Sequence, residues 1–449
     1  MRASLIHQTI QAMKIAVIQF PGSNCERETH LALQRNNMQS YDVLWCNKQV
    51  DLNEFDGFVI VGGFSYEDRV RAGLIATKDP LIDKLKLQAD MGKPVLGICN
   101  GAQILLETGL VPGIADNRIM LALANNQRIA NNQVIATGYY NAWVHIKPMT
   151  LRKHQAFTHN ITNDSILKMP ISHAEGCFVT DENIMQALRK SSATLWQYCD
   201  DKGNTDNNFP TNPNGSIHSL AAISNLAGNV LAIMPHPERT QLADSSLFAS
   251  MHQHIKNGSS IDIADTQKQN EAINSIKLQH SKNLIKQHVA NDNINFIVKL
   301  VITDNEAVSL QKACSKIGIQ VNIQKYSYWD ISVTNNDKTT RETTTQKIIK
   351  TAEIYNNNKE VMFDDFNKIT NSTENSKIFL VHDKANIAGK EKLNSLHRGY
   401  DLRDIKEIKF ATAWKITPVN PDDDIAELTD AIHKNHLLFN QFQHDCFVV

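Results

Sequence analysis

Short runs of β-branched and other apolar residues, separated by amphipathic stretches, dominate the first half of the chain. These runs predict strands at 14–20, 42–46, 57–62, 94–98, 134–137, 142–146, 177–180 and 229–234. Helical spacing of apolar residues falls between them at 26–37, 79–91, 102–107 and 242–256. Strands that alternate with helices are typical of a parallel sheet with right-handed crossovers. The pattern therefore predicts one α/β domain over residues 13–256.

The amino-acid composition changes after this domain. Residues 257–294 are polar and rich in Asn, Gln, Lys and Ser, with a weak helical pattern. This composition favours a linker, although a surface helix of the first domain fits the pattern equally well.

From residue 295 onward a strand–helix–strand–helix order occurs twice, in 295–370 and in 376–449. The expected elements are strands at 296–302, 320–333, 377–381 and 405–416 and helices at 306–317, 344–356, 389–399 and 424–434. Two points of likeness align the copies, namely Trp329-Asp330-Ile331 with Trp414-Lys415-Ile416, and Phe363/Phe366 with Phe439/Phe442. The shared order predicts a tandem duplication of a small α+β unit.

Length, charge and cysteine content exclude several classes of protein. A chain of 449 residues predicts two to four domains, and its net charge of −1 argues against binding nucleic acid or anionic lipid by bulk charge. No apolar run reaches the roughly 18 residues that a membrane helix needs. Residues 1–12 lack the apolar core of a secretion signal, so Met13 is a possible start. Seven scattered cysteines without a C-x-x-C pair predict neither disulfides nor a zinc site, and together these features favour the cytoplasm.

The segment GICNG at 97–101 directly follows a predicted strand and precedes a predicted helix. A nucleophile between two glycines at such a junction is the pattern of a nucleophile elbow. Here the central residue is Cys99, and the positive end of the helix dipole favours the reactive thiolate. A buried cysteine in a glycine-rich turn would give the same short pattern.

A second cluster, MPHPER at 234–239, ends the last predicted strand of the first domain. The carboxyl ends of parallel strands meet at one edge of a sheet, so His236 is expected near Cys99. A cysteine nucleophile needs a base, and the base needs a third group to orient it. Glu238 lies two residues further on and can face the same side as His236.

A third segment, VGGFSYED at 61–68, also follows a strand. Two successive glycines leave backbone N–H groups accessible, which suits an oxyanion hole or a phosphate-binding turn. Neither G-x-G-x-x-G nor G-x-x-x-x-G-K-[ST] occurs in the chain, which weakens the nucleotide alternative.

In these motifs, residues 13–240 resemble the glutaminase subunit of phosphoribosylformylglycinamidine synthase, the PurQ type of class I (triad) glutamine amidotransferase. The matching stretches, in chain order, are MKIAVIQFPGSNCERE (13–28), VGGFSYEDRVRAG (61–73), GKPVLGICNGAQIL (92–105), PISHAEG (170–176), NPNGS (212–216) and MPHPER (234–239). The resemblance implies that Cys99 is the nucleophile, that His236 is the general base and acid, and that Glu238 orients His236. It implies further substrate and oxyanion contacts from Gly62, Gly63, Phe64, Asn100, Gln103, His173 and Glu175. It implies no metal or cofactor in this chain.

Each C-terminal copy resembles the small PurS subunit of the same synthase, chiefly in its order of elements. In the second copy the likeness is carried by NIAGK at 386–390, IKEI at 405–408 and WKI at 414–416. In the family that subunit dimerises and bridges glutaminase and synthetase. Two fused copies are therefore expected to form a pseudo-dimer within one chain, and self-association through these units is a further expectation.

The expected architecture is a class I glutamine amidotransferase domain of the α/β class followed by two small α+β PurS-like units. The expected function is release of ammonia from glutamine for a separate, PurL-type synthetase subunit, which converts formylglycinamide ribonucleotide to formylglycinamidine ribonucleotide. ATP and magnesium are expected on that partner. Two alternatives stay open: an amidotransferase that serves another synthetase, and a scaffold with a vestigial triad.

Overall fold

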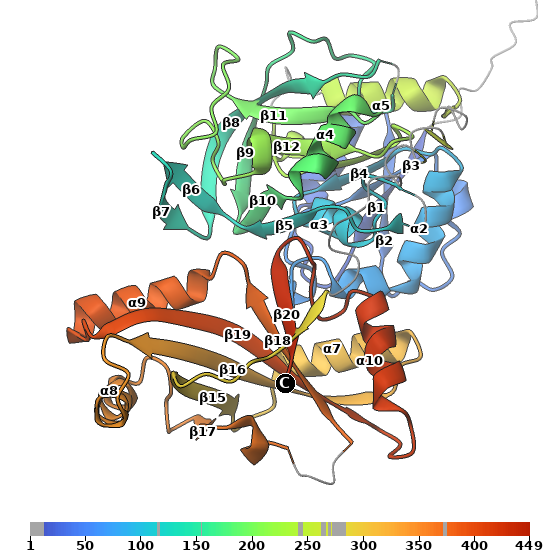
Figure 1. The fold of residues 1–449 in the computed structure, drawn as a ribbon. Helices are drawn as coiled ribbons and strands as arrows, with labels where there is room; N and C mark the ends of the chain where they lie inside the picture. Colours follow the sequence, from blue (N-terminus) through green and yellow to red (C-terminus); the bar gives the residue numbers. More distant parts are fainter. Residues whose placement is uncertain are drawn as a thin grey trace, which may run out of the picture. The chain divides into compact units, whose positions relative to one another are not determined.

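The computed structural model describes residues 13–114, 117–153, 155–240, 246–261, 266–267, 271, 284–370 and 375–449. The chain divides into two compact units, Met1–Ile276 and Lys277–Val449 (Figure 1). None of the helices in the described ranges has the length and apolar character that crossing a bilayer requires.

A nine-stranded mixed sheet forms the centre of the first unit (Figure 1). In spatial order its strands are β2 (Gln39–Leu44), β1 (Lys14–Gln19), β3 (Gly57–Ile60), β4 (Val95–Ile98), β13 (Val230–Ile233), β12 (Leu220–Ser224), β11 (Leu195–Cys199), β8 (Tyr140–Thr150) and β9 (Leu167–His173). Neighbouring strands from β2 to β13 are parallel, and those from β13 to β9 are antiparallel. The predicted α/β class is confirmed, and the sheet continues into an antiparallel half that the sequence pattern does not predict.

The helices of the first unit connect and cover these strands. They are α1 (Glu26–Arg35), α2 (Pro80–Asp90), α3 (Asn100–Glu107), α4 (Glu182–Lys190) and α5 (Ser246–Lys256). Two small antiparallel pairs complete the unit: β5 (Ala122–Asn125) with β10 (Glu175–Val179), and β6 (Gln127–Ala130) with β7 (Gln133–Thr137). Every residue of β3, β4 and β13 is buried, as expected for central strands that are covered on both faces.

The second unit is built on one seven-stranded sheet. In spatial order its strands are β14 (Ile285–Gln287), β20 (His444–Val448), β18 (Lys377–Asp383), β19 (Ile405–Pro418), β16 (Val321–Val333), β15 (Ile294–Leu300) and β17 (Glu360–Phe363). Its helices are α7 (Asn305–Lys316), α8 (Lys338–Thr351), α9 (Ile387–Tyr400) and α10 (Ile425–Lys434). Strand β14 lies within the segment 257–294, for which the sequence predicts a linker or a surface helix, and half of that segment is outside the described residues.

Equivalent pairs of residues occur in both halves of this sheet. Phe296 lies opposite Trp329 between β15 and β16, and Phe379 lies opposite Trp414 between β18 and β19. The two tryptophans thus have the same place in each half, which agrees with the alignment of the two copies around them.

The second point of that alignment is wrong. In the first half Phe363 pairs with Ile297, and in the second half Phe447 pairs with Leu380, the counterpart of Ile297. The counterpart of Phe363 is therefore Phe447 and not Phe439. The structure adds a fifth element, the strand β17 or β20, to the four-element order predicted for each copy.

Candidate active site

Cys99 occupies the turn between β4 and α3, at the edge of the sheet where the parallel strands end. Its backbone is in a conformation that side chains rarely adopt, with φ of 52° and ψ of −105°. The Cys99 N–H donates to the carbonyl of Ile233 on β13 at 2.8 Å, and this bond ties the turn to the neighbouring strand. A non-glycine residue held at positive φ costs of the order of 1–3 kcal/mol, and such strain is common at functional sites.

The two flanking glycines serve close packing, because the positive φ falls on Cys99 itself. A Cβ atom on Gly97 would lie 2.5 Å from the carbonyl oxygen of Gly101, and one on Gly101 would lie 2.1 Å from that of Ile60. Both distances are far below van der Waals contact. The elbow pattern thus needs glycine at both positions so that α3 can pack directly against β3 and β4.

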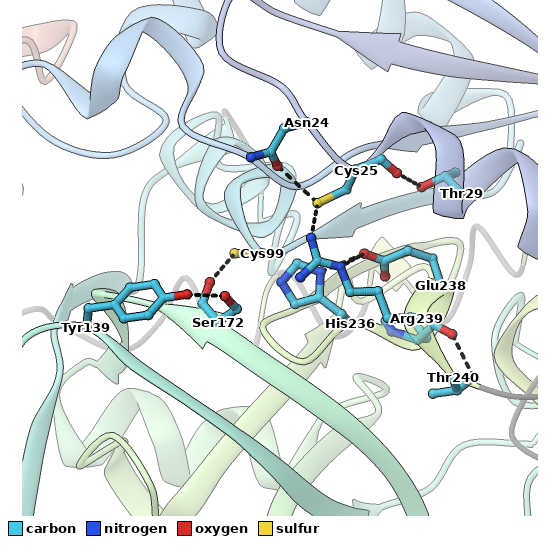
Figure 2. A network of polar contacts seen from close by, with 11 residues as sticks. Asn24, Cys25, Thr29, Cys99, Tyr139, Ser172, His236, Glu238, Arg239 and Thr240 are labelled. Carbon is cyan, nitrogen blue, oxygen red and sulfur yellow. Dashed lines mark hydrogen bonds and ion pairs between the residues drawn. The ribbon is translucent and has the colours of Figure 1, made fainter.

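His236 follows β13 and forms a short, buried contact with Glu238, which lies in the 3-10 turn Pro237–Arg239 (Figure 2). His236 Nδ1 and Glu238 Oε1 are 2.6 Å apart, and each of the two residues is only 2% exposed. A carboxylate on Nδ1 fixes the ring and leaves Nε2 as the atom that can exchange a proton with a reacting group.

The protonation of His236 results from opposing effects. Burial disfavours the charged imidazolium, whereas the Glu238 carboxylate and then the Cys99 thiol favour it, so that the pKa of His236 lies well above its ordinary value. His173 behaves in the opposite way, because burial and then the charge on His236 lower the pKa of His173 to about 3. One imidazole is thus charged at neutral pH while its neighbour is neutral.

Cys25, Cys99 and His236 converge on Gly62. A Cβ atom on Gly62 would lie 3.0 Å from Cys25 Sγ, 3.0 Å from His236 Cε1 and 3.4 Å from Cys99 Cβ. The Cys99 and Cys25 thiols are close enough to raise the pKa of His236. Within the described residues, no group is placed to form a hydrogen bond with His236 Nε2. Glycine at position 62 therefore allows these three side chains to approach one another.

The backbone around Gly63 is only partly available for an oxyanion. Gly63 has a φ of 146°, but the N–H of Phe64 donates to Gly22 at 2.9 Å and that of Ser65 donates to Asn100 Oδ1 at 3.1 Å. An oxyanion hole built here would therefore use the N–H groups of Gly63 and Asn100. Phe64 is 46% exposed, so its ring is open to a ligand.

Asn100 and Gln103 are buried and bound to other protein groups. Asn100 Nδ2 donates to Gln103 Oε1 at 2.8 Å, and Gln103 Nε2 donates to the carbonyl of Glu175 at 2.7 Å. Both ends of the Gln103 amide are thus occupied. Gln103 connects α3 to β10 in this conformation, while its contact with glutamine stays a prediction.

His173 and Glu175 lie on either side of the junction between β9 and β10. His173 Nδ1 is 3.2 Å from Asn126 Oδ1, and Glu175 Oε2 accepts from the N–H of Ala72 at 3.4 Å. Ser172, the residue before His173, has its carbonyl 3.9 Å from Cys99 Sγ. The motif PISHAEG is therefore brought next to Cys99.

Two residues without a predicted role belong to this cluster. Cys25 Sγ accepts a hydrogen bond from Arg239 Nη2 at 3.0 Å, and Arg239 Nε lies 3.9 Å from Glu238 Oε1 (Figure 2). Their stretches, PGSNCERE and MPHPER, are far apart in the chain and meet only in the fold. The only sign in the sequence that Cys25 and Arg239 belong to the site is that each lies in one of the stretches that match the family.

Comparison with known proteins identifies the first unit. Residues 12–264 match the family model of the CobB/CobQ-like glutamine amidotransferase domain. The chain is 44% identical over 232 residues to the phosphoribosylformylglycinamidine synthase subunit PurQ of Methanothrix thermoacetophila, covering 51% of this chain and 88% of that protein. The PurQ subunit of Pyrococcus furiosus is 37% identical over 228 residues, covering 51% and 89%. A PurLQS structure from Thermotoga maritima is 25% identical, with a TM-score of 0.43, covering 54% of this chain and 99% of that one.

Proposed function

The chain belongs to the CobB/CobQ-like glutamine amidotransferase family as a PurQ-type glutaminase subunit, and from this premise we propose that Cys99, His236 and Glu238 are its catalytic triad. One observation carries this assignment: a strained Cys99 turn and a buried His236–Glu238 pair meet at Gly62. If the chain were a scaffold with a vestigial triad, no function would maintain the strained Cys99 turn beside an oriented His236 ring.

In the proposed reaction Cys99 Sγ attacks the amide carbon of glutamine. The thiol proton resides on His236, whose charged form Glu238 stabilises, and the carbonyl oxygen becomes an oxyanion near the N–H groups of Gly63 and Asn100. His236 donates its proton to the departing nitrogen, so the C–N bond breaks and ammonia leaves a thioester on Cys99. Water, deprotonated by His236, then hydrolyses the thioester to glutamate. These steps use protein groups and water alone.

The proposed acceptor of the ammonia is a separate synthetase of the PurL type, which would form formylglycinamidine ribonucleotide with ATP and magnesium. Support comes from the PurQ relatives, whose names describe a subunit of that synthase. Free ammonia would be protonated and lost to solvent, so the partner is expected to dock during turnover. We also propose a cytoplasmic location, which the seven scattered cysteines without a C-x-x-C pair favour.

For the second unit we propose two PurS-like halves that form a pseudo-dimer. Strands β16 and β19 pair antiparallel along their length, and Ser327 lies opposite Thr412. The alignment on Trp329 and Trp414 makes these two residues counterparts, so a local two-fold axis passes between them. The strand edge through which two separate PurS-like units would pair is thus already used within this chain. Self-association, if it occurs, would use other edges such as β14 or β17.

The test is product formation by the full chain with a PurL-type synthetase, using glutamine or an ammonium salt as nitrogen donor. Cys99→Ala is expected to lose glutamine-dependent activity and keep ammonium-dependent activity. Cys46→Ala, which changes an exposed cysteine, is the matched control and should keep both. Glutamine use by Cys99→Ala at the wild-type rate would refute the triad.

A further inference from the structure

Three buried side chains beside the proposed nucleophile carry donor atoms that metals bind. They are the Cys25 thiol, the His236 imidazole and the Glu238 carboxylate, each no more than 2% exposed. One donor atom from each lies within 4.8 Å of the other two, and no further set of three such side chains in the described ranges meets that condition. The cluster thus joins a residue outside the proposed triad to two residues within it.

Two buried polar atoms of this cluster lack a hydrogen-bond partner among the described residues, His236 Nε2 and Glu238 Oε2. Leaving a buried polar group unpaired costs about 1–3 kcal/mol, so such atoms are rare in native proteins and call for an explanation. Catalysis explains the unpaired Nε2 of His236. It does not explain the second oxygen of Glu238, nor a thiol beside both residues.

We propose that Cys25, His236 and Glu238 form a binding site for Zn²⁺, and that zinc bound there blocks the glutaminase. Thiolate, imidazole and carboxylate together are a zinc-type ligand set, whereas magnesium and calcium prefer oxygen ligands alone. Zinc–ligand distances are about 2.0–2.3 Å. The three donor atoms lie within 4.8 Å of one another, so small side-chain movements that part His236 Nδ1 from Glu238 Oε1 would bring all three within such distances of one ion.

Binding is an exchange of protons for metal and involves no oxidation. The Cys25 S–H bond breaks as the Zn–S bond forms, and His236 gives up its extra proton to bind as neutral imidazole. Both protons go to solvent, so the affinity for zinc should fall as the pH is lowered. His236 in this state can neither accept nor return a proton, which stops glutamine hydrolysis.

Arg239 opposes the metal. Its guanidinium donates to Cys25 Sγ at 3.0 Å, which places a positive charge beside the sulfur that zinc would take. The Arg239 side chain is 31% exposed, so it has room to turn toward solvent when zinc binds. Removing this charge with Arg239→Gln should tighten zinc binding by about tenfold or more.

The first measurement is zinc binding to the full chain by competition with a chromogenic chelator. Wild type is expected to bind one equivalent that Cys25→Ala, and equally Cys25→Ser, weakens by at least about tenfold. The exposed-cysteine variant Cys46→Ala should bind as wild type does. Wild-type affinity in both Cys25 variants would overturn the proposal, and thermal unfolding of each variant without zinc verifies that it is folded.

The inhibitory effect rests on the proposed function, whereas binding does not, and Cys99→Ala separates the two. This variant should keep the zinc equivalent while losing glutamine hydrolysis. If wild type hydrolyses glutamine and stoichiometric zinc does not inhibit it, the zinc proposal fails alone. If wild type never releases glutamate but binds zinc through Cys25, the glutaminase assignment fails and the site stands.

Discussion

Glu238→Gln is the substitution that most sharply separates orientation of His236 from mere packing. The amide is nearly the same size as the carboxylate, so the buried contact at 2.6 Å can persist without its charge. The Glu238 carboxylate is the largest influence that favours the charged form of His236. The variant is therefore expected to lower the pKa of His236 and to weaken its preference for the orientation that serves Cys99.

The size of the effect follows from the strength of a charge-assisted hydrogen bond, which contributes about 1.5–3 kcal/mol in proteins. At 1.36 kcal/mol for each factor of ten, kcat for glutamine hydrolysis should fall roughly 10- to 150-fold. Stability should respond too, because the folded-state pKa of His236 is raised. The stabilisation from the pair is fully present below about pH 6.5 and is lost as the pH rises through the folded-state value.

The assay is glutamate release as a function of pH with the synthetase present. In Glu238→Gln the loss of activity on the basic side should begin at lower pH than in wild type, while ammonium-dependent activity stays unchanged. Glu182→Gln is the matched control, since it alters the exposed pair of Glu182 and His218, which are 2.9 Å apart. A Glu238→Gln enzyme with wild-type kcat and an unshifted pH profile would refute the orienting role.

Two further predictions concern the fold around the site. Gly101→Ala should markedly lower the melting temperature, because its Cβ would lie 2.1 Å from the carbonyl oxygen of Ile60. Gly399 lies in open space within α9, so Gly399→Ala should maintain or raise the melting temperature, because alanine stabilises a helix by roughly 1 kcal/mol relative to glycine. Equal melting temperatures for the two variants would contradict this packing. Burial raises the pKa of Asp68 to about 6, so the folded state holds a proton there that the unfolded chain loses near pH 4. The free energy of unfolding should therefore fall as the pH rises from about 4 to 6, and Asp68→Asn should flatten that part of the curve measured by urea unfolding.

Much of the fold could be predicted where apolar runs coincide with fully buried strands. The strands β1, β3, β4 and β13 were found within two residues of their ends for this reason. The antiparallel strands β9, β11 and β12 were missed. Strand β9 (LKMPISH) alternates apolar and polar residues but is interrupted by Pro170, and β11 and β12 are only five residues long. Helix α8 begins at Lys338, six residues before the predicted start, because the Asp337 side chain caps a first turn of polar residues that carries no hydrophobic signal.

The candidate site could be predicted only for residues that lie in short sequence motifs. Cys99 and the pair of His236 and Glu238 lie in short motifs at the ends of strands, and the topology of a parallel sheet brings such ends together. Cys25 could not be given a role, because its contact with Arg239 depends on two loops that meet only after folding. The occupied amide of Gln103 likewise follows from tertiary contacts with β10.

The most direct measurement for the central claim is covalent labelling by a glutamine-analogue electrophile, followed by peptide mass mapping of the full chain. The proposed triad predicts one adduct, on Cys99, which is absent in Cys99→Ala and forms more slowly in Glu238→Gln. Cys25 is buried against Arg239 and Cys46 lies outside the site, so neither should react at a comparable rate. Glutamine hydrolysis without an adduct on Cys99, or labelling that persists in Cys99→Ala, would contradict the assignment.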